Sequence, residues 1–345
     1  MIKLALDILT DKEKRNKVLI VILSIVVGAI FLLFAPVAVL MTMGEIEPPH
    51  ISGNFEQSAW MQLLDNEQQE RITQMESAGQ QIASAMESVG VREQTIKAQL
   101  IYVSCFDDVV VDDFNAYANL FRYALDDAAL INSINQTYGL EIVYEDFMRS
   151  YALISHVIIN PYMFTGAQTK NSTDLVIWAK QAYENGWGYV YGTYGNILTE
   201  ELLLDRASMF GEQVTGFEDF IRENWMRRRT ADCVGLIKGY GWYNPDSGEI
   251  VVGTNGMADL TANGMFDAAT VKGTIDTIPE VPGLAVWQDG HIGIYIGNGE
   301  VIEAMGTEQG VVKTTLPSGW THWLEIPYIS YATTEEPTTE ESQEG

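Results

Sequence analysis

The feature that most constrains this chain is a long uncharged segment near its start. None of the 26 residues from Val18 to Met43 is charged, and as a helix they would reach about 39 Å, more than the ~30 Å hydrocarbon core of a bilayer. Five Lys or Arg residues precede the run, and Glu45 and Glu47 follow it. The positive-inside rule therefore places residues 1–17 in the cytoplasm. We expect a transmembrane signal anchor at 18–43, with the rest of the chain on the extracytoplasmic side of the cell membrane.

A cleaved signal peptide is the alternative interpretation of this segment. The apolar region of such a peptide usually spans about 7 to 15 residues and ends at a small-residue cleavage site. The run in this chain is longer and has only a poor match near Ala38. Its length favours the uncleaved anchor.

Composition divides the exported part into further segments. Residues 44–57 predict an extended linker, because Pro48 and Pro49 cannot lie inside a helix. Residues 58–160 carry apolar residues at helical spacing and predict a small all-α domain. Residues 161–173 are rich in Gly, Asn, Ser and Thr, which indicates a second linker.

Within the all-α domain we expect a first helix through residues 72–89 and further helices at about 112–132 and 142–159. The apolar stripe of the first helix could also form a self-associating coiled-coil stalk. That structure needs three or four sustained heptads, and the stripe has fewer. Cys105 lies in an apolar stretch, so we interpret it as a small buried hydrophobic residue without chemistry.

Residues 174–332 predict an α+β domain. A helix pattern follows residue 173, and strand-like patterns then dominate, with turns at 246–248, 289–290 and 297–299. The final residues, 333–345, repeat Thr and Glu without any large apolar side chain and predict a disordered acidic tail.

Charge and cysteine content exclude several classes of protein. The chain has 47 acidic and 20 basic residues and a net charge of −27, which would repel a phosphate backbone and excludes a nucleic-acid binder. Two cysteines and four histidines cannot supply a structural zinc site of the usual ligand spacing or a disulfide framework. We therefore expect no metal and no cofactor.

Cys233 lies where a helix is expected to start. The residues around it, Thr230 to Lys238, place Thr230 or Asp232 near the helix cap and the thiol in the first turn. Free N–H groups and the helix dipole at that position stabilise an anion, which lowers a thiol pKa and suits a nucleophile. A buried core cysteine is the alternative unless a base lies nearby.

A candidate base, His291, begins a predicted strand. Three antiparallel strands joined by tight turns are expected over 283–287, 291–296 and 300–304. Period-2 alternation puts His291 on the face opposite Ile292 and its aliphatic neighbours. Cys233 and His291 are therefore a candidate catalytic dyad, although spacing alone does not prove it.

Three motifs in order resemble the NlpC/p-sixty family of papain-like cell-wall cysteine peptidases. Asp232-Cys233-x-Gly235 and the run from Gly290 to Gly299 resemble two of them, and Gly188-Tyr189-Val190-Tyr191-Gly192 resembles the family's Pro-Tyr-x-Trp-Gly segment. The resemblance covers about 174–331. The overall layout is similar to membrane-anchored cell-wall hydrolases of conjugative elements in Gram-positive bacteria.

The resemblance implies a function for each matched residue. It implies a papain-like peptidase domain that hydrolyses amide bonds in peptidoglycan stem peptides, commonly between D-γ-glutamate and the diamino acid. By matched position, Cys233 would be the nucleophile and His291 the general base. Tyr189 and Asp232 would lie near the amino end of the substrate peptide.

Glu303 departs from the family pattern, which usually has His, Asn or Gln at this third polar position. A carboxylate can still accept a hydrogen bond from the imidazole and stabilise an imidazolium. Alternatively, Glu303 is an exposed strand residue, and His322 or another group orients His291. We assign Glu303 to the catalytic set.

Register decides whether Glu303 can reach the base. With a two-residue turn, Glu303 would oppose Ile294 and face away from His291. With a three-residue loop at 297–299, it would oppose Gly293 on the same face as His291. The two glycines around the turn favour the longer loop, so we expect Glu303 to bond or closely flank His291.

A second departure is the length of 193–232, where the family has a short loop. Glu218 to Arg229 reads as an inserted helix with a basic end, Arg227-Arg228-Arg229. The basic residues could simply favour the helix C-terminus. Alternatively, Arg229 binds carboxylates of the stem peptide beside Cys233.

Together these observations predict a membrane-anchored, extracytoplasmic peptidoglycan endopeptidase with a Cys-His mechanism, acting in local wall opening during conjugative transfer. Its expected partners are peptidoglycan stem peptides, the cell membrane and other components of a conjugation complex. Two alternatives stay open. One is a binding-only scaffold of a conjugation or secretion complex, and the other is a Cys-His transacylase on the same fold.

Overall fold

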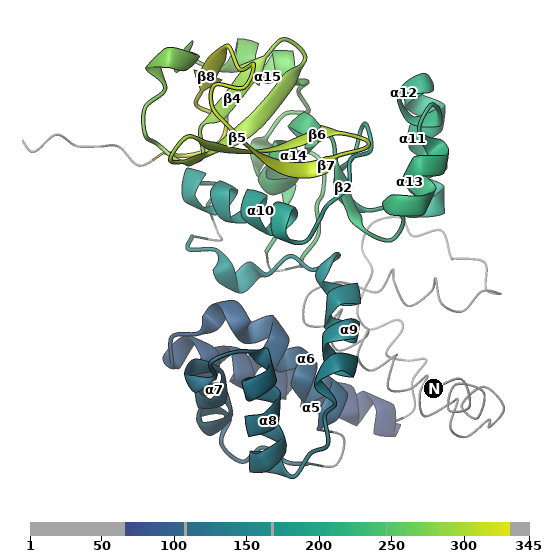
Figure 1. Cartoon of the computed structure of the whole chain (residues 1–345), viewed down its shortest axis with the longest axis vertical. Helices are drawn as coiled ribbons and strands as arrows, with labels where there is room; N and C mark the ends of the chain where they lie inside the picture. The colour runs from purple at the N-terminus through teal and green to yellow at the C-terminus, as the bar shows by residue number, and fades with distance from the viewer. Residues whose placement is uncertain (1–65, 107–108, 167–168, 246, 332–345) are drawn as a thin grey trace, which may run out of the picture. The chain divides into compact units, whose positions relative to one another are not determined.

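The computed structural model describes most of the chain outside its two ends. The described ranges are 66–106, 109–166, 169–245 and 247–331. They divide into two compact units, of which the first runs to Met163 and the second runs from Phe164 to Tyr243 and resumes at Ile250 (Figure 1).

Four predicted segments lie outside the described residues: the cytoplasmic segment at 1–17, the anchor at 18–43, the linker at 44–57 and the acidic tail at 333–345. Within the described ranges, none of the helices combines the length and the apolar character needed to cross a bilayer.

The first unit is helical, as predicted. Its α-helices are α5 (Asn66–Ser88), α6 (Thr95–Cys105), α7 (Phe114–Tyr123), α8 (Asp127–Tyr138) and α9 (Tyr144–Ser155), with short 3-10 turns η1 (Arg92–Gln94) and η2 (Pro161–Met163). The apolar stripe of α5 supplies Ile82 and Met86 to the buried core, where they join residues of α6, α7 and α8. Packing against neighbouring helices thus covers Ile82 and Met86 of the stripe that we considered for a coiled coil.

Two helix predictions in this unit need correction. The expected helix at 112–132 is interrupted after Tyr123, where Ala124 and Asp126 adopt extended backbone conformations. Asp126 then caps α8 by accepting the backbone N–H of Ala129 at 2.8 Å, so a new helix starts there. The later helix is shorter than the predicted 142–159.

The second unit is α+β, which confirms the coarser part of the predicted fold class. Its main sheet has six antiparallel strands in the order β3-β8-β4-β5-β6-β7. These strands are β3 (Lys272–Thr274), β4 (Ala285–Gln288), β5 (His291–Gly297), β6 (Glu300–Gly306), β7 (Gly310–Thr315) and β8 (His322–Leu324). The three central strands match the three predicted from sequence.

A smaller ladder and several helices complete this unit. The ladder pairs β1 (Tyr194–Ile197) with β2 (Arg229–Ala231). The helices are α10 (Ser172–Glu184), α11 (Glu200–Phe210), α12 (Glu212–Thr215), α13 (Glu218–Asn224), α14 (Cys233–Trp242) and α15 (Ala262–Ala268), with 3-10 turns η3 (Thr254–Gly256) and η4 (Ile275–Thr277).

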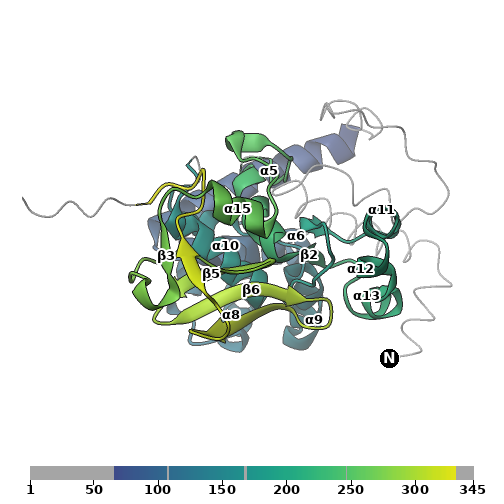
Figure 2. The same ribbon diagram turned by 90° about the horizontal axis from the view of Figure 1, so that it is seen from above.

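Helices α10 and α14 pack against one face of the main sheet (Figures 1 and 2). Ile292 and Ile294 of β5 are fully buried, and the alternation of the strand directs His291 and Gly293 to the opposite face. The buried isoleucines therefore hold the sheet against these helices, and the opposite face has a second apolar cluster that includes Tyr295.

Two glycines let α14 approach the backbone of Thr193 and Tyr194. A Cβ added to Gly235 would lie 2.0 Å from the carbonyl oxygen of Thr193, and one added to Gly239 would lie 2.1 Å from that of Tyr194. Neither position accepts a larger residue without moving the backbone. This contact fixes the helix that begins at Cys233.

The second unit begins earlier than the predicted boundary at 174. Asp174 is buried and accepts hydrogen bonds from the backbone N–H groups of Thr165 and Gly166, at 2.7 and 2.9 Å. Asn171 is the N-cap of α10, and its side chain accepts the N–H of Asp174. Much of the predicted linker at 161–173 is thus part of the folded unit.

The inserted segment contains more structure than the single predicted helix. Helices α11, α12 and α13 lie together beside β2, at the end of the unit away from β3 (Figures 1 and 2). They have a small core of their own with Leu203, Val214 and Ile221. The predicted helix at 218–229 ends at Asn224, and the last of the three arginines belongs to β2.

Candidate active site

Cys233 is the first residue of α14, as the sequence predicts. Asp232 is the N-cap, and its side chain accepts the backbone N–H of Gly235 at 2.6 Å. The backbone N–H of Asp232 donates to the carbonyl oxygen of Thr193 at 2.9 Å. The cap and the close packing at Gly235 together set the position of the thiol.

The thiol is surrounded by backbone donors but is largely buried. Cys233 is 9% exposed. Burial raises the pKa of its thiol to about 12, and the negative charge of Asp232 adds to that shift, whereas hydrogen bonds from the backbone N–H groups of Val234, Ile292 and Cys233 itself lower it. The expectation of a lowered thiol pKa is therefore wrong. The helix start does stabilise the anion, but removal of the sulfur from water is the larger effect.

His291 and Glu303 meet across β5 and β6. Ile294 pairs with Ile302 and Tyr295 with Val301, which is the register that places Glu303 opposite Gly293. The Nε2 atom of His291 lies 2.6 Å from Oε2 of Glu303. Since an ionised carboxylate only accepts, the imidazole donates this hydrogen bond. The predicted contact is present.

The register arises differently from the prediction. Gly297 pairs with Glu300, so the turn itself has only two residues, Asn298 and Gly299, both with positive φ. A bulge between Tyr295 and Gly297 shifts the pairing by one residue, which is what a β-bulge does to the rest of a ladder. The bulge, rather than a longer loop, brings Glu303 to the face of His291.

Two further residues hold the imidazole and the carboxylate. The hydroxyl of Thr314 donates to Oε1 of Glu303 at 2.6 Å, and Glu303 is only 5% exposed. The indole of Trp320 stacks on the His291 ring, with centroids 5.3 Å apart and planes 12° apart. The stacking therefore fixes the plane of the imidazole, and the hydrogen bond to Glu303 fixes its Nε2 atom.

Sequence reasoning missed Thr314 and Trp320. Thr314 lies on β7, two residues along from Val312, the partner of Glu303 in the ladder. An explicit prediction of this strand would have placed it diagonally across from Glu303. Trp320 follows a loop, and no local pattern indicates where its ring lies.

The backbone brings nucleophile and base into one site. Ile292 directly follows His291, and its backbone N–H group is close enough to the sulfur of Cys233 to lower the pKa of the thiol. Because Glu303 binds Nε2, the Nδ1 atom of His291 is the nitrogen left to take the thiol proton. The arrangement has the parts of a nucleophile, a base and a group that orients the base.

His322, the alternative orienting group, lies elsewhere. Its Nδ1 atom is 3.0 Å from the hydroxyl oxygen of Thr321, and its ring packs edge-on against the rings of Phe266 and Trp287. It therefore does not orient His291, and Glu303 occupies that position.

Tyr189 and Asp232 lie beside Cys233. Burial raises the pKa of the Tyr189 phenol, and the negative charges of Cys233 and Asp232 add to the shift, so the phenol is close to both groups. Asp232 is 7% exposed, and its second carboxylate oxygen accepts the N–H of Gly192 at 2.8 Å. In the structure Asp232 ties the Tyr189 segment to the start of α14.

Arg229 does not occupy the predicted position at a helix end. It lies in β2 and is 3% exposed. Its Nη1 atom donates to the carbonyl oxygen of Gly195 at 2.5 Å, and its guanidinium lies over the ring of Trp187. Burial lowers its pKa to about 10. A guanidinium buried inside the unit in this way is not accessible to a substrate peptide, so we do not retain it as a substrate contact.

Comparison with known proteins finds little. No protein-family model matches the chain, and no curated protein matches it. Among solved structures, the chain is similar to the peptidoglycan hydrolase RipB from Mycobacterium tuberculosis, with 16% sequence identity, coverage of 52% of this chain and 85% of that chain, and a TM-score of 0.27. An identity and a TM-score this low assign neither a family nor an activity to this chain.

The raised thiol pKa makes a prediction about Cys233 reactivity. In a Cys105→Ala background, which leaves one cysteine, we expect iodoacetamide to alkylate Cys233 at pH 7 at least about tenfold faster when His291 is present than in His291→Ala. A thiol with a raised pKa stays protonated at neutral pH unless a base removes its proton. In His291→Ala the rate should still be rising at about pH 9, above the ordinary cysteine pKa. Equal rates at pH 7, measured by mass spectrometry, would contradict the dyad.

The carboxylate at position 303 makes a second prediction. Glu303→Ala should lower kcat for the thiol-dependent reaction by about a hundredfold, and Glu303→Gln by about tenfold, because an amide oxygen still accepts from Nε2 but carries no charge. Glu300→Gln, in the same strand and paired with Lys313 at 2.7 Å, is the control and should keep full activity. An alanine variant with unchanged kcat would remove Glu303 from the site.

Proposed function

We propose that this protein is a cysteine peptidase that hydrolyses amide bonds in peptidoglycan stem peptides, of the D-γ-glutamyl-diamino acid endopeptidase type. The observation that carries the proposal is the arrangement of three groups: the Cys233 thiol at a helix start, the His291 imidazole next to Ile292, whose N–H lowers the pKa of that thiol, and the Glu303 carboxylate on Nε2 of the imidazole. The substrate class rests on the resemblance of the motifs around these residues to cell-wall peptidases.

The geometry supports acyl transfer through a thioester. Nδ1 of His291 takes the proton of the Cys233 thiol, and the sulfur attacks the amide carbon. Backbone N–H groups at the start of α14 stabilise the oxyanion. The leaving amine departs with the proton from His291, and the acyl group stays on sulfur.

Deacylation uses the same residues. His291 removes a proton from water, the hydroxide attacks the thioester carbon, and the thiolate leaves and regains the proton as the acid is released. Glu303 stays ionised throughout and stabilises the imidazolium each time it forms. Thr314 holds the other carboxylate oxygen, so the orientation of Glu303 persists through both steps.

The activity test compares the two cysteines. Cys233→Ala should abolish release of stem-peptide fragments from purified muropeptides, whereas Cys105→Ala should keep at least about half of the activity. Cys105 lies in the helical unit, where burial raises its thiol pKa to about 11. Mass spectrometry of the products would identify the bond that is cleaved.

Other outcomes of this digestion separate the alternatives. Binding of muropeptides without cleavage, unchanged in Cys233→Ala, would favour a scaffold of a conjugation or secretion complex. Transfer of the acyl group to an added amine, in place of water, would favour a transacylase. Cleavage that persists in both cysteine variants would contradict the peptidase mechanism.

We further propose that residues 18–43 anchor the protein in the cell membrane, with both units on the extracytoplasmic side, and that it opens the wall locally during conjugative transfer. The support is the uncharged run with its basic upstream flank and the layout similar to cell-wall hydrolases of conjugative elements.

The anchor makes a prediction about topology. Protease added to intact, wall-stripped cells should degrade both units and leave a membrane-embedded N-terminal fragment, since only the segment before Val18 is expected in the cytoplasm. A cytoplasmic protein serves as the control for cell lysis. Full protection of the units would contradict the predicted orientation, and their release into the medium without protease would indicate cleavage of the anchor.

A further inference from the structure

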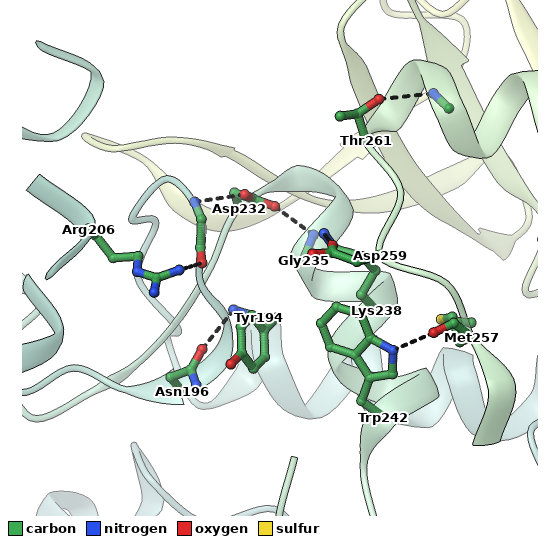
Figure 3. Close-up of polar contacts among 12 residues, drawn as sticks. Tyr194, Asn196, Arg206, Asp232, Gly235, Lys238, Trp242, Met257, Asp259 and Thr261 are labelled. Carbon is green, nitrogen blue, oxygen red and sulfur yellow. Dashed lines mark hydrogen bonds and ion pairs between the residues drawn. The ribbon is translucent and has the colours of Figure 1, made fainter. Parts of the chain in front are cut away.

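The inserted helices contact the backbone of the segment that borders Cys233. Arg206 of α11 donates from Nη1 to the carbonyl oxygen of Gly192 at 3.0 Å, and the N–H of Gly192 donates to Asp232 at 2.8 Å (Figure 3). The residue Gly192 is thus bound by the insert through its carbonyl group and by the cap of the catalytic helix through its N–H group.

The shape of this contact requires glycine. Gly192 has a φ of +81°, and an added Cβ would lie 2.1 Å from the ring of Phe210 at the end of α11. The same ring packs edge-on against Tyr191, with centroids 5.0 Å apart. Phe210 therefore covers the outer side of the turn that follows Tyr189.

The insert also holds the other end of this segment. A Cβ added to Gly188 would lie 2.4 Å from the ring of Trp225, which follows α13. Trp225 in turn donates from its indole N–H to the carbonyl oxygen of Thr307 at 2.7 Å. Between the two glycines, Val190 is fully buried in the core of the insert with Leu203.

The segment held in this way is bonded to the residue before the thiol, because the N–H of Gly192 donates to the side chain of Asp232. Burial and the charges of Asp232 and Cys233 raise the pKa of Tyr191, and the same two groups act on Tyr189. Both phenols are therefore close to the nucleophile.

We propose that the insert is a positioning element for the substrate: Arg206 and Phe210 hold residues 188–192 in the conformation that binds the peptide next to Cys233. The inference rests on the proposed peptidase function. It adds Arg206 and Phe210, which lie in the insert, to the residues that the motifs indicate. The nucleophile has its own supports, because α14 packs on the backbone of Thr193 and Tyr194 through two glycines. Loosening the insert should therefore weaken peptide binding more than it changes the thiol.

The test replaces Arg206 and compares it with a second arginine of the insert. Arg206→Met should raise KM for a stem peptide about tenfold, as expected for loss of one charge-assisted hydrogen bond, and leave kcat within about threefold. Arg206→Lys should lie between it and the wild type. Arg222→Met is the control, because among the described residues the ion pairs of Arg222 are with Glu200 and Glu218, both in the insert, and exposed ion pairs of this kind contribute little.

Two further readouts do not depend on turnover. Alkylation of Cys233 by iodoacetamide should stay within about twofold of wild type in Arg206→Met, and hydrogen exchange should accelerate in residues 188–193 but not in α14. If the wild type cleaves no peptide, the proposed function fails and the exchange pattern still decides the positioning role. An unchanged exchange pattern with an unchanged KM, or equal acceleration in α14, would overturn the inference.

Discussion

The buried carboxylate of Asp232 is the interaction on which the rest of the site depends. Its two oxygens accept the N–H groups of Gly235, in α14, and of Gly192, 40 residues earlier in the chain. Burial raises the pKa of this carboxyl group, and the two backbone donors act in the opposite direction. A buried charge is tolerable only when it is hydrogen-bonded on each side. The start of the catalytic helix and the segment that carries Tyr189 are therefore joined through a single side chain, while the glycine packing of α14 supports the helix in addition.

This arrangement explains how the chain accommodates a long insertion next to its nucleophile. The β1–β2 ladder pairs Tyr194 with Ala231 and Ile197 with Arg229. These two strands flank the inserted helices in the chain, so the ladder holds the two ends of the insertion together. Once loop ends are held together, added length costs little free energy. The insert also buries its own apolar residues. The geometry of Cys233 therefore depends on the Asp232 cap and on the glycine packing of α14, and not on the insert. Arg206 and Phe210 of the insert contact the turn at Gly192.

The sequence indicates the parts of this structure that depend on local pattern. The helix start at Cys233, the central strands and the face of His291 follow from capping residues and period-2 alternation. The register of Glu303 was predicted correctly but for a different reason, because a bulge near Gly297 has no reliable local signature. The burial of Arg229 and the stacking of Trp320 on His291 could not be predicted, since both depend on contacts between segments far apart in the chain. The same holds for the helices of the insert, whose apolar residues face one another rather than the main sheet.

The environment of the thiol gives the carboxylate at position 303 a physical rationale. Burial raises the pKa of Cys233 to about 12, so the thiolate forms only if the proton moves to a partner whose positive charge is stabilised. An amide at position 303 would orient the imidazole without stabilising its cation, whereas a carboxylate does both. Burying that carboxylate is costly, and the hydrogen bonds from His291 and Thr314 offset the cost. Burial of Cys233 disfavours its thiolate. The carboxylate of Glu303 offsets this effect, because it stabilises the imidazolium that forms together with the thiolate.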